Sequence, residues 1–164
     1  MLNADLKQQL KQLLELMESD VEFVASLGSD DKSKELKELL DEIADMSARI
    51  TVTENDLKRT PSFSVNRPGE ETGVTFAGIP LGHEFNSLVL AILQVSGRAP
   101  KEKQSVIDQI KGLEGPFHFE TFVSLTCQKC PDVVQALNLM SVINPNITHT
   151  MIDGAVFREE SEDI

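Results

Sequence analysis

Two cysteines, Cys127 and Cys130, are the residues of this sequence whose type and spacing most clearly favour chemistry. They lie in "LTCQKCPDVV" and are the only cysteines among 164 residues. The pattern predicts a strand that ends in a CxxC motif, with Pro131 in the first turn of the following helix. Unpaired backbone N–H groups and the helix dipole would favour a thiolate at Cys127 there. Cys127 would exchange with a partner disulfide, and Cys130, one turn further on, would resolve the mixed disulfide.

Two other interpretations of the cysteine pair stay open. A zinc site needs four ligands, usually from two such pairs, whereas the other candidate ligands are the scattered His83, His118 and His149. The cysteines could also be two inert, buried thiols, although the N-terminus of a helix is an exposed and polarised position. His118 and His149 lie in alternating strand patterns, so we expect them on the solvent side, without a functional role.

The composition excludes several classes of function. The chain has 15 Lys and Arg against 27 Asp and Glu, a net charge of −12. Phosphate backbones and anionic membranes need clustered cations, so this balance argues against nucleic acid and against an anionic membrane surface. We see no signal-type segment and no run near the ~20 apolar residues of a membrane span. We therefore expect a cytoplasmic protein, where structural disulfides are rare and a CxxC pair favours redox or metal chemistry.

The elements that position these residues recur in two halves. "FVASLGSDDKSKEL" and "FVSLTCQKCPDVV" align almost without gaps, and each follows a helix and precedes another helix and a strand. A strand–helix–strand unit predicts a parallel pair, and turn signals after the second strand of the first half predict an added antiparallel hairpin. Ser33 is the expected cap of the first half's second helix. The fold class is therefore α/β with a mixed sheet. The predicted helices are 6–17, 34–47, 83–97, 100–113 and 132–143. The predicted strands are 21–27, 49–55, around 63–65 and 74–77, and 117–125, and residues 144–154 are predicted to form a turn and a last strand.

Three long stretches are similar to one protein family. "SLTCQKCPDVVQALNLMSVINPNITHTMIDG", "FAGIPLGHEFNSLVLAILQVSG" and "PSFSVNRPG" resemble the N-terminal module of AhpF, the flavoprotein component of alkyl hydroperoxide reductase. The resemblance implies two tandem thioredoxin-like (glutaredoxin-like) folds that share one mixed sheet. Residues 1–98 would form a repeat without cysteines, with Pro61 at the family's cis-proline position. Residues 99–164 would form the CxxC repeat, truncated before its hairpin and last helix, so we expect an exposed face on strand 117–125 and a disordered tail from Ala155.

The same resemblance implies a role in peroxide detoxification. In the family, electrons pass from NADH through FAD to a dithiol of the flavin portion, and then to the N-terminal module. That module reduces the disulfide of the peroxidase subunit, and the whole protein is a homodimer. Carried over, Cys127 exchanges with both partners and Cys130 is its internal partner. FAD and NADH belong to the flavin portion, and this chain shows no Gly-rich dinucleotide fingerprint, so we expect no cofactor site in it. We also expect no metal site, because one cysteine pair and three scattered histidines do not supply the four ligands of a zinc ion.

Glu84, in "GHEF", has two interpretations. The simpler one is an acid in the first turn of a helix, where the dipole favours it. The resemblance also implies that the first repeat flanks the active site of the second, where the Glu84 carboxylate would raise a thiol pKa or shuttle a proton. Two alternative functions for the whole chain remain: a non-catalytic interaction module, and a free-standing glutaredoxin-like disulfide reductase.

Overall fold

A computed structural model describes residues 2–163. The order of its elements confirms the predicted succession of helices and strands in both halves of the chain. The elements are α1 (Ala4–Leu14), β1 (Val21–Ser26), α2 (Asp31–Asp45), β2 (Ile50–Glu54), β3 (Ser62–Asn66), β4 (Val74–Ala77), the 3₁₀ turn η1 (Gly82–Glu84), α3 (Phe85–Val95), α4 (Gln104–Lys111), β5 (Phe117–Val123), α5 (Cys130–Ile143), β6 (Ile147–Asp153) and α6 (Arg158–Glu162).

One six-stranded sheet runs through both halves, in the order β2-β1-β3-β4-β6-β5. The pairs β1/β2 and β5/β6 are parallel, whereas β3 is antiparallel to both β1 and β4. A parallel pairing of β4 with β6 joins the halves. Both the parallel strand–helix–strand units and the antiparallel hairpin are therefore confirmed, and the mixed sheet is continuous.

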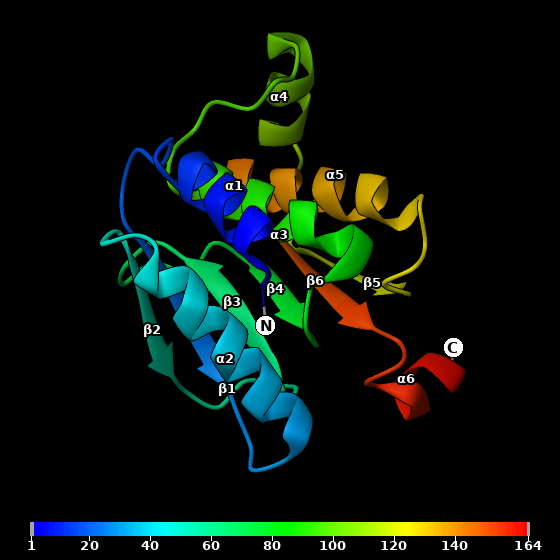
Figure 1. Cartoon of the computed structure of the whole chain (residues 1–164). Helices are drawn as coiled ribbons and strands as arrows, with labels where there is room; N and C mark the ends of the chain where they lie inside the picture. Colours follow the sequence, from blue (N-terminus) through cyan, green and yellow to red (C-terminus); the bar gives the residue numbers. More distant parts are fainter. Residues whose placement is uncertain (1, 164) are drawn as a thin grey trace.

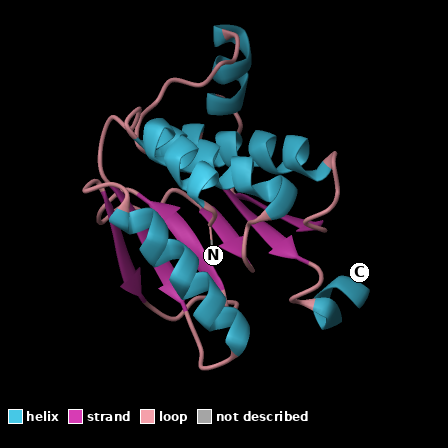
Figure 2. Cartoon of the chain, viewed as in Figure 1, coloured by secondary structure: helices cyan, strands magenta, loops and turns pink. Residues whose placement is uncertain are grey.

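The helices gather beside the sheet, as Figure 1 and Figure 2 show. Helices α3 and α5 lie next to each other and carry contacts between the halves. Helix α4 projects away from the rest and buries no residue. No helix in residues 2–163 combines the length and the apolar character that a membrane span requires.

Most of the buried hydrophobic side chains lie in the first half. Phe23, Phe63 and Phe76, on β1, β3 and β4, are fully buried. The Phe63 ring lies 5.4 Å from each of the other two, edge-on to Phe23 and stacked on Phe76. Strand β5 ends the sheet, and Phe117 on it is 40% exposed. Phe117 is therefore exposed as expected, whereas Phe119 and Phe122 on the same strand are half-buried.

The loop before β3 carries the predicted proline. The Thr60–Pro61 peptide bond is cis, which confirms the expectation for Pro61. A second cis bond, Gly115–Pro116, stands just before β5 and was not predicted. The Thr60 hydroxyl lies 2.7 Å from the Ser26 hydroxyl at the end of β1, so this loop is fixed against the first strand.

Two expectations about local structure are wrong. Ser33 is not the cap of α2, because the N-cap is Asp30 and Ser33 lies within the first turn. The tail from Ala155 is not disordered, because residues 158–162 form α6. The single N–H of Arg59 Nε is shared between the two carboxylate oxygens of Glu160 in this helix, at 2.9 and 3.1 Å, and Arg59 Nη2 donates to Glu160 at 2.8 Å. A buried arginine thus holds the tail against the first half.

Candidate functional site

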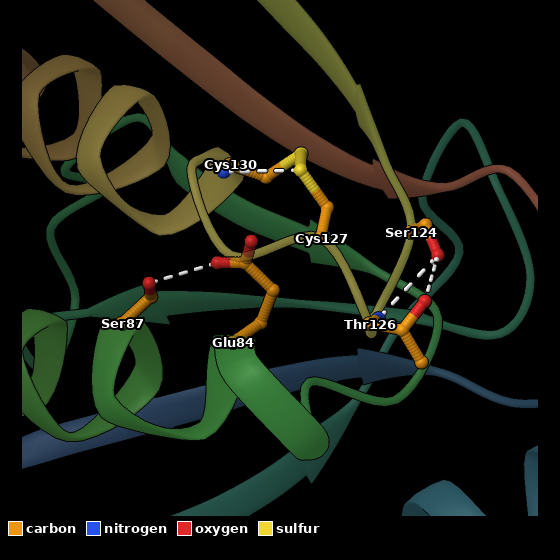
Figure 3. The surroundings of a disulfide bond; sticks show 6 residues. All are labelled: Glu84, Ser87, Ser124, Thr126, Cys127 and Cys130. Atoms are coloured by element: carbon orange, nitrogen blue, oxygen red, sulfur yellow. Dashed lines mark hydrogen bonds between the residues drawn. A yellow bond between two sulfur atoms is a disulfide. The ribbon is translucent and has the colours of Figure 1, made fainter.

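A disulfide bond joins Cys127 and Cys130, whose Cα atoms are 5.6 Å apart (Figure 3). Cys127 lies in the turn that follows β5, and Cys130 is the first residue of α5. The backbone N–H of Cys130 donates a hydrogen bond to Cys127 Sγ at 3.2 Å. The structure therefore places the first sulfur against the N-terminus of a helix, where an unpaired N–H would stabilise a thiolate.

Local hydrogen bonds shape the turn that carries Cys127. Its backbone N–H donates to the Ser124 carbonyl at 3.0 Å, and the Ser124 and Thr126 hydroxyls lie 3.0 Å apart. Pro131 stands in the first turn of α5, where its missing N–H leaves no helical hydrogen bond unmade. Both cysteines are half-buried, and Cys130 packs against the hydrophobic core. The turn is therefore ordered, and Cys130 is its inner residue.

Glu84 lies beside this turn, although it belongs to the other half of the chain. Its side chain is fully buried, and Figure 3 shows the carboxyl group pointing toward the segment between Cys127 and Cys130. Burial raises the pKa of this carboxyl, while the Ser87 hydrogen bond and the charge of His83 act in the opposite direction. The structure thus brings the three predicted site residues together.

The approach of the two halves depends on a glycine. Gly82 has φ +58°, and a Cβ there would lie 2.7 Å from the Leu125 carbonyl oxygen. The same carbonyl accepts a hydrogen bond from the His83 N–H at 3.0 Å. A side chain at position 82 would push η1 away from the loop that leads to Cys127, so Gly82 sets the distance between Glu84 and the disulfide.

The histidines do not join this site. His118 is exposed, as expected, and lies 3.4 Å from Glu120. The expectation for His149 is wrong, because this side chain is fully buried between Asn138 Oδ1 at 2.7 Å and Thr121 Oγ1 at 2.8 Å. Burial lowers its pKa to about 4, so the ring is neutral near pH 7. Within residues 2–163, no group of three or more His, Cys, Asp or Glu side chains is arranged to hold a metal ion.

Two residues near Glu84 were not predicted. Ser87 Oγ donates to Glu84 Oε1 at 2.8 Å, and Gln135 Nε2 donates to Ser87 Oγ at 3.2 Å. Ser87 could have been found, since residues three apart share one face of a helix. Gln135 could not, because it comes from α5 in the other half and only the packing of α3 against α5 brings it near.

Comparisons with known proteins agree on one family, although no family model matches the sequence. The chain is 93% identical, over its whole length, to the F component of alkyl hydroperoxide reductase (AhpF) of Staphylococcus epidermidis, and it spans 32% of that protein. The solved NTD_N/C domain of alkylhydroperoxide reductase AhpF from Enterococcus faecalis is 32% identical with a TM-score of 0.92, and the match covers 99% of this chain and 85% of that one.

A more distant structure shows the fold alone. A protein disulfide oxidoreductase from Aeropyrum pernix K1 is 19% identical with a TM-score of 0.84, over 98% of this chain and 78% of that one. The expected thioredoxin-like α/β fold with one mixed sheet is thereby confirmed. The matches to the Staphylococcus epidermidis protein and to the Enterococcus faecalis domain show that the chain belongs to the AhpF family of alkyl hydroperoxide reductase components and corresponds to its N-terminal domain.

Proposed function

We propose that this chain is a dithiol–disulfide electron-transfer module of an NADH-dependent disulfide oxidoreductase. Residues 1–98 and 99–164 are its two thioredoxin-like repeats. It passes electrons from the flavin portion of the family's protein to the disulfide of the peroxidase subunit, in the cytoplasm and within a homodimer. The observation that carries this proposal is the Cys127–Cys130 disulfide, located between a strand end and a helix N-terminus.

The proposed cycle begins with the oxidised pair. NADH and FAD would supply the two electrons that reduce a disulfide of the flavin portion to a dithiol, and that portion lies outside this chain. One thiolate of that dithiol attacks the disulfide and forms a mixed disulfide, and the second thiol resolves it. Cys127 and Cys130 are then both reduced, and the reductant's own pair is oxidised.

Delivery to the peroxidase subunit repeats the exchange in the opposite sense. The Cys127 thiolate attacks one sulfur of the peroxidase disulfide, and the other sulfur leaves as a thiolate that takes up a proton. Cys130 then attacks Cys127 Sγ, which restores the original disulfide and releases the second peroxidase thiol. The N–H of Cys130, which points at Cys127 Sγ, supports the thiolate form before the attack.

Glu84 is the proton-handling group in this proposal. Its carboxyl is buried beside the pair, with Oε2 making no hydrogen bond within the described part of the chain. Because burial raises its pKa, the carboxyl can hold a proton and transfer it as the thiols form and disappear. Glu84→Gln should lower the Cys127 thiol pKa, which the alkylation rate against pH measures. It should also slow disulfide exchange, which is followed as a rate of its own. Unchanged values would remove Glu84 from the mechanism.

The function is tested by reconstitution. The chain, the separately produced flavin portion and the peroxidase subunit are combined with NADH and a hydroperoxide. We expect NADH oxidation that requires all three proteins and is lost with Cys127→Ser. Reduction of small disulfides with glutathione alone would favour the free-standing reductase. Partner binding that survives Cys127→Ser, without any electron transfer by the unmodified chain, would favour the interaction module.

A further inference from the structure

We propose that Ser87 is a positioning residue that, together with Gln135, fixes the orientation of the Glu84 carboxyl and the oxygen that carries its proton. The proposal rests on the role given above to Glu84 and extends it to two residues with no assigned part. It starts from a chain of two hydrogen bonds that crosses between the halves of the molecule. The chain runs from Gln135 Nε2 to Ser87 Oγ at 3.2 Å and from Ser87 Oγ to Glu84 Oε1 at 2.8 Å.

The donors of this chain allow one direction only. A glutamine amide nitrogen donates and cannot accept, so Gln135 occupies a lone pair of the Ser87 oxygen. Ser87 has a single hydroxyl proton, and with its oxygen serving as acceptor, that proton points to Glu84 Oε1. Ser87 is 1% exposed, so water does not compete for this hydroxyl. Gln135 therefore orients Ser87, and Ser87 orients Glu84.

The consequence falls on the second carboxyl oxygen. Glu84 Oε2 is buried and has no hydrogen-bond partner in residues 2–163. In Figure 3 the oxygen that is not bonded to Ser87 points toward the Cys127–Cys130 segment. Because Oε1 is occupied as an acceptor, the proton of the neutral acid resides on Oε2, on the side of the cysteines. Ser87 thus places the proton where the reacting sulfurs can use it.

Ser87 also limits how far burial raises the Glu84 pKa, since its hydrogen bond favours the carboxylate. The surroundings leave few other groups that could do so. Helices α3 and α5 pack against η1, and α3 has no titratable side chain. The titratable groups on η1, on α5 and in the turn before it are His83, Lys129 and Asp132, and Cys127 and Cys130 join them only when their disulfide is reduced.

The test measures the titration of Glu84 directly. Carbon-13 NMR of the labelled, oxidised chain follows the glutamate side-chain carboxyl signals against pH, and Glu84→Gln identifies the signal. Ser87→Ala should raise the midpoint by about one pH unit, the size expected from losing a hydrogen bond to a charged group. Gln135→Leu should raise the Glu84 midpoint by less than Ser87→Ala does. Ser87→Thr, which keeps the hydroxyl, should leave the midpoint at the value of the unmodified chain. Ser141→Ala is the matched control, because Ser141 is also a buried helical serine but bonds to the Leu137 carbonyl.

The outcomes separate this inference from the proposed function. A Glu84 midpoint in Ser87→Ala equal to that in Ser141→Ala would overturn the inference, whatever the exchange rate. If Ser87→Ala does not fold, Gln135→Leu at its half-buried site decides, and an unchanged midpoint there would also overturn it. If Glu84→Gln leaves disulfide exchange unchanged while Ser87→Ala shifts the midpoint, the positioning stands and the proton-handling role of Glu84 falls.

Discussion

The two halves of the molecule close the same turn by different means. After β5, a disulfide links Cys127 to Cys130 at the start of α5. After β1, the corresponding turn before α2 contains no cysteine and is closed by hydrogen bonds. Ser33 Oγ accepts from the Gly28 N–H at 2.9 Å and donates to Asp30 at 2.6 Å. A polar side chain therefore does in one half what a covalent bond does in the other.

This difference shows that the strand–turn–helix unit does not depend on thiol chemistry. The first half keeps the cis Pro61 loop and the buried phenylalanine core without any cysteine. The first half contributes to the proposed chemistry from a different position, because Glu84 at the end of η1 lies beside the cysteine turn of the second half. One half would supply the sulfurs and the other the buried acid.

The largest effect is expected from the second half's turn. Cys127→Ser should reduce disulfide exchange at least about a thousandfold, because the attacking sulfur is gone. Cys130→Ser should still attack through Cys127 but accumulate the mixed disulfide, which is visible by mass spectrometry of the intact protein. The matched control is Ser33→Ala in the other turn, which should leave exchange unchanged. Equal losses in Cys127→Ser and Ser33→Ala would show that the two turns do not differ in what they contribute to disulfide exchange.

The next effect concerns the contact that ties the halves together on the side of α6. Arg59 is 8% exposed and bonds to Glu160 and, at 2.7 Å, to Glu120 on β5. Arg59→Gln should lower the free energy of unfolding by about 1–3 kcal/mol. The loss should lie toward the lower end of this range, because Glu160 is partly exposed and water screens its charge. Hydrogen exchange should also speed up in residues 158–162, with Lys58→Gln, at an exposed neighbour, as the control.

The Arg59 contact has a defined pH dependence. Its hydrogen bonds lower the pKa of the Glu120 and Glu160 carboxyls. Such groups stabilise the fold above their unfolded pKa of about 4.3, and this contribution disappears as the pH falls through the lower folded values. The stability difference between the unmodified chain and Arg59→Gln should therefore shrink below about pH 4. A difference that stays constant into acid would show that Arg59 acts through packing alone.

A smaller effect is expected from Ser33→Ala on stability. The substitution leaves the Gly28 N–H without its partner and should lower the free energy of unfolding by about 1–2 kcal/mol. Urea denaturation measures this loss. Ser105→Ala, on the projecting helix α4, is an exposed control that should change stability little. An unaffected Ser33→Ala would mean that the hydrogen bonds of this turn add no net stability.

The sequence was sufficient for the local elements and the cysteine turn, and insufficient where distant segments meet. Hydrophobic periodicity located the strands and helices, and the family resemblance located the cis bond at Pro61. His149 was misassigned because β6 lies between β4 and β5, where alternation with threonine does not reveal which side is covered. The tail was misassigned because the charged segment "REESED" is typical of a solvated, disordered end. Its ordering depends on the contact of Glu160 with Arg59, which is 101 positions away in the sequence. Gln135 was missed for the same reason.

We propose above all that Cys127 and Cys130 form a working redox couple. The most direct test equilibrates the chain in glutathione buffers of graded oxidising strength, quenches it with acid, alkylates the free thiols and weighs the products. We predict that the pair converts reversibly between disulfide and dithiol in a single two-electron transition. A pair that stays in one form across all the buffers, or that yields only stable glutathione adducts, would contradict this account.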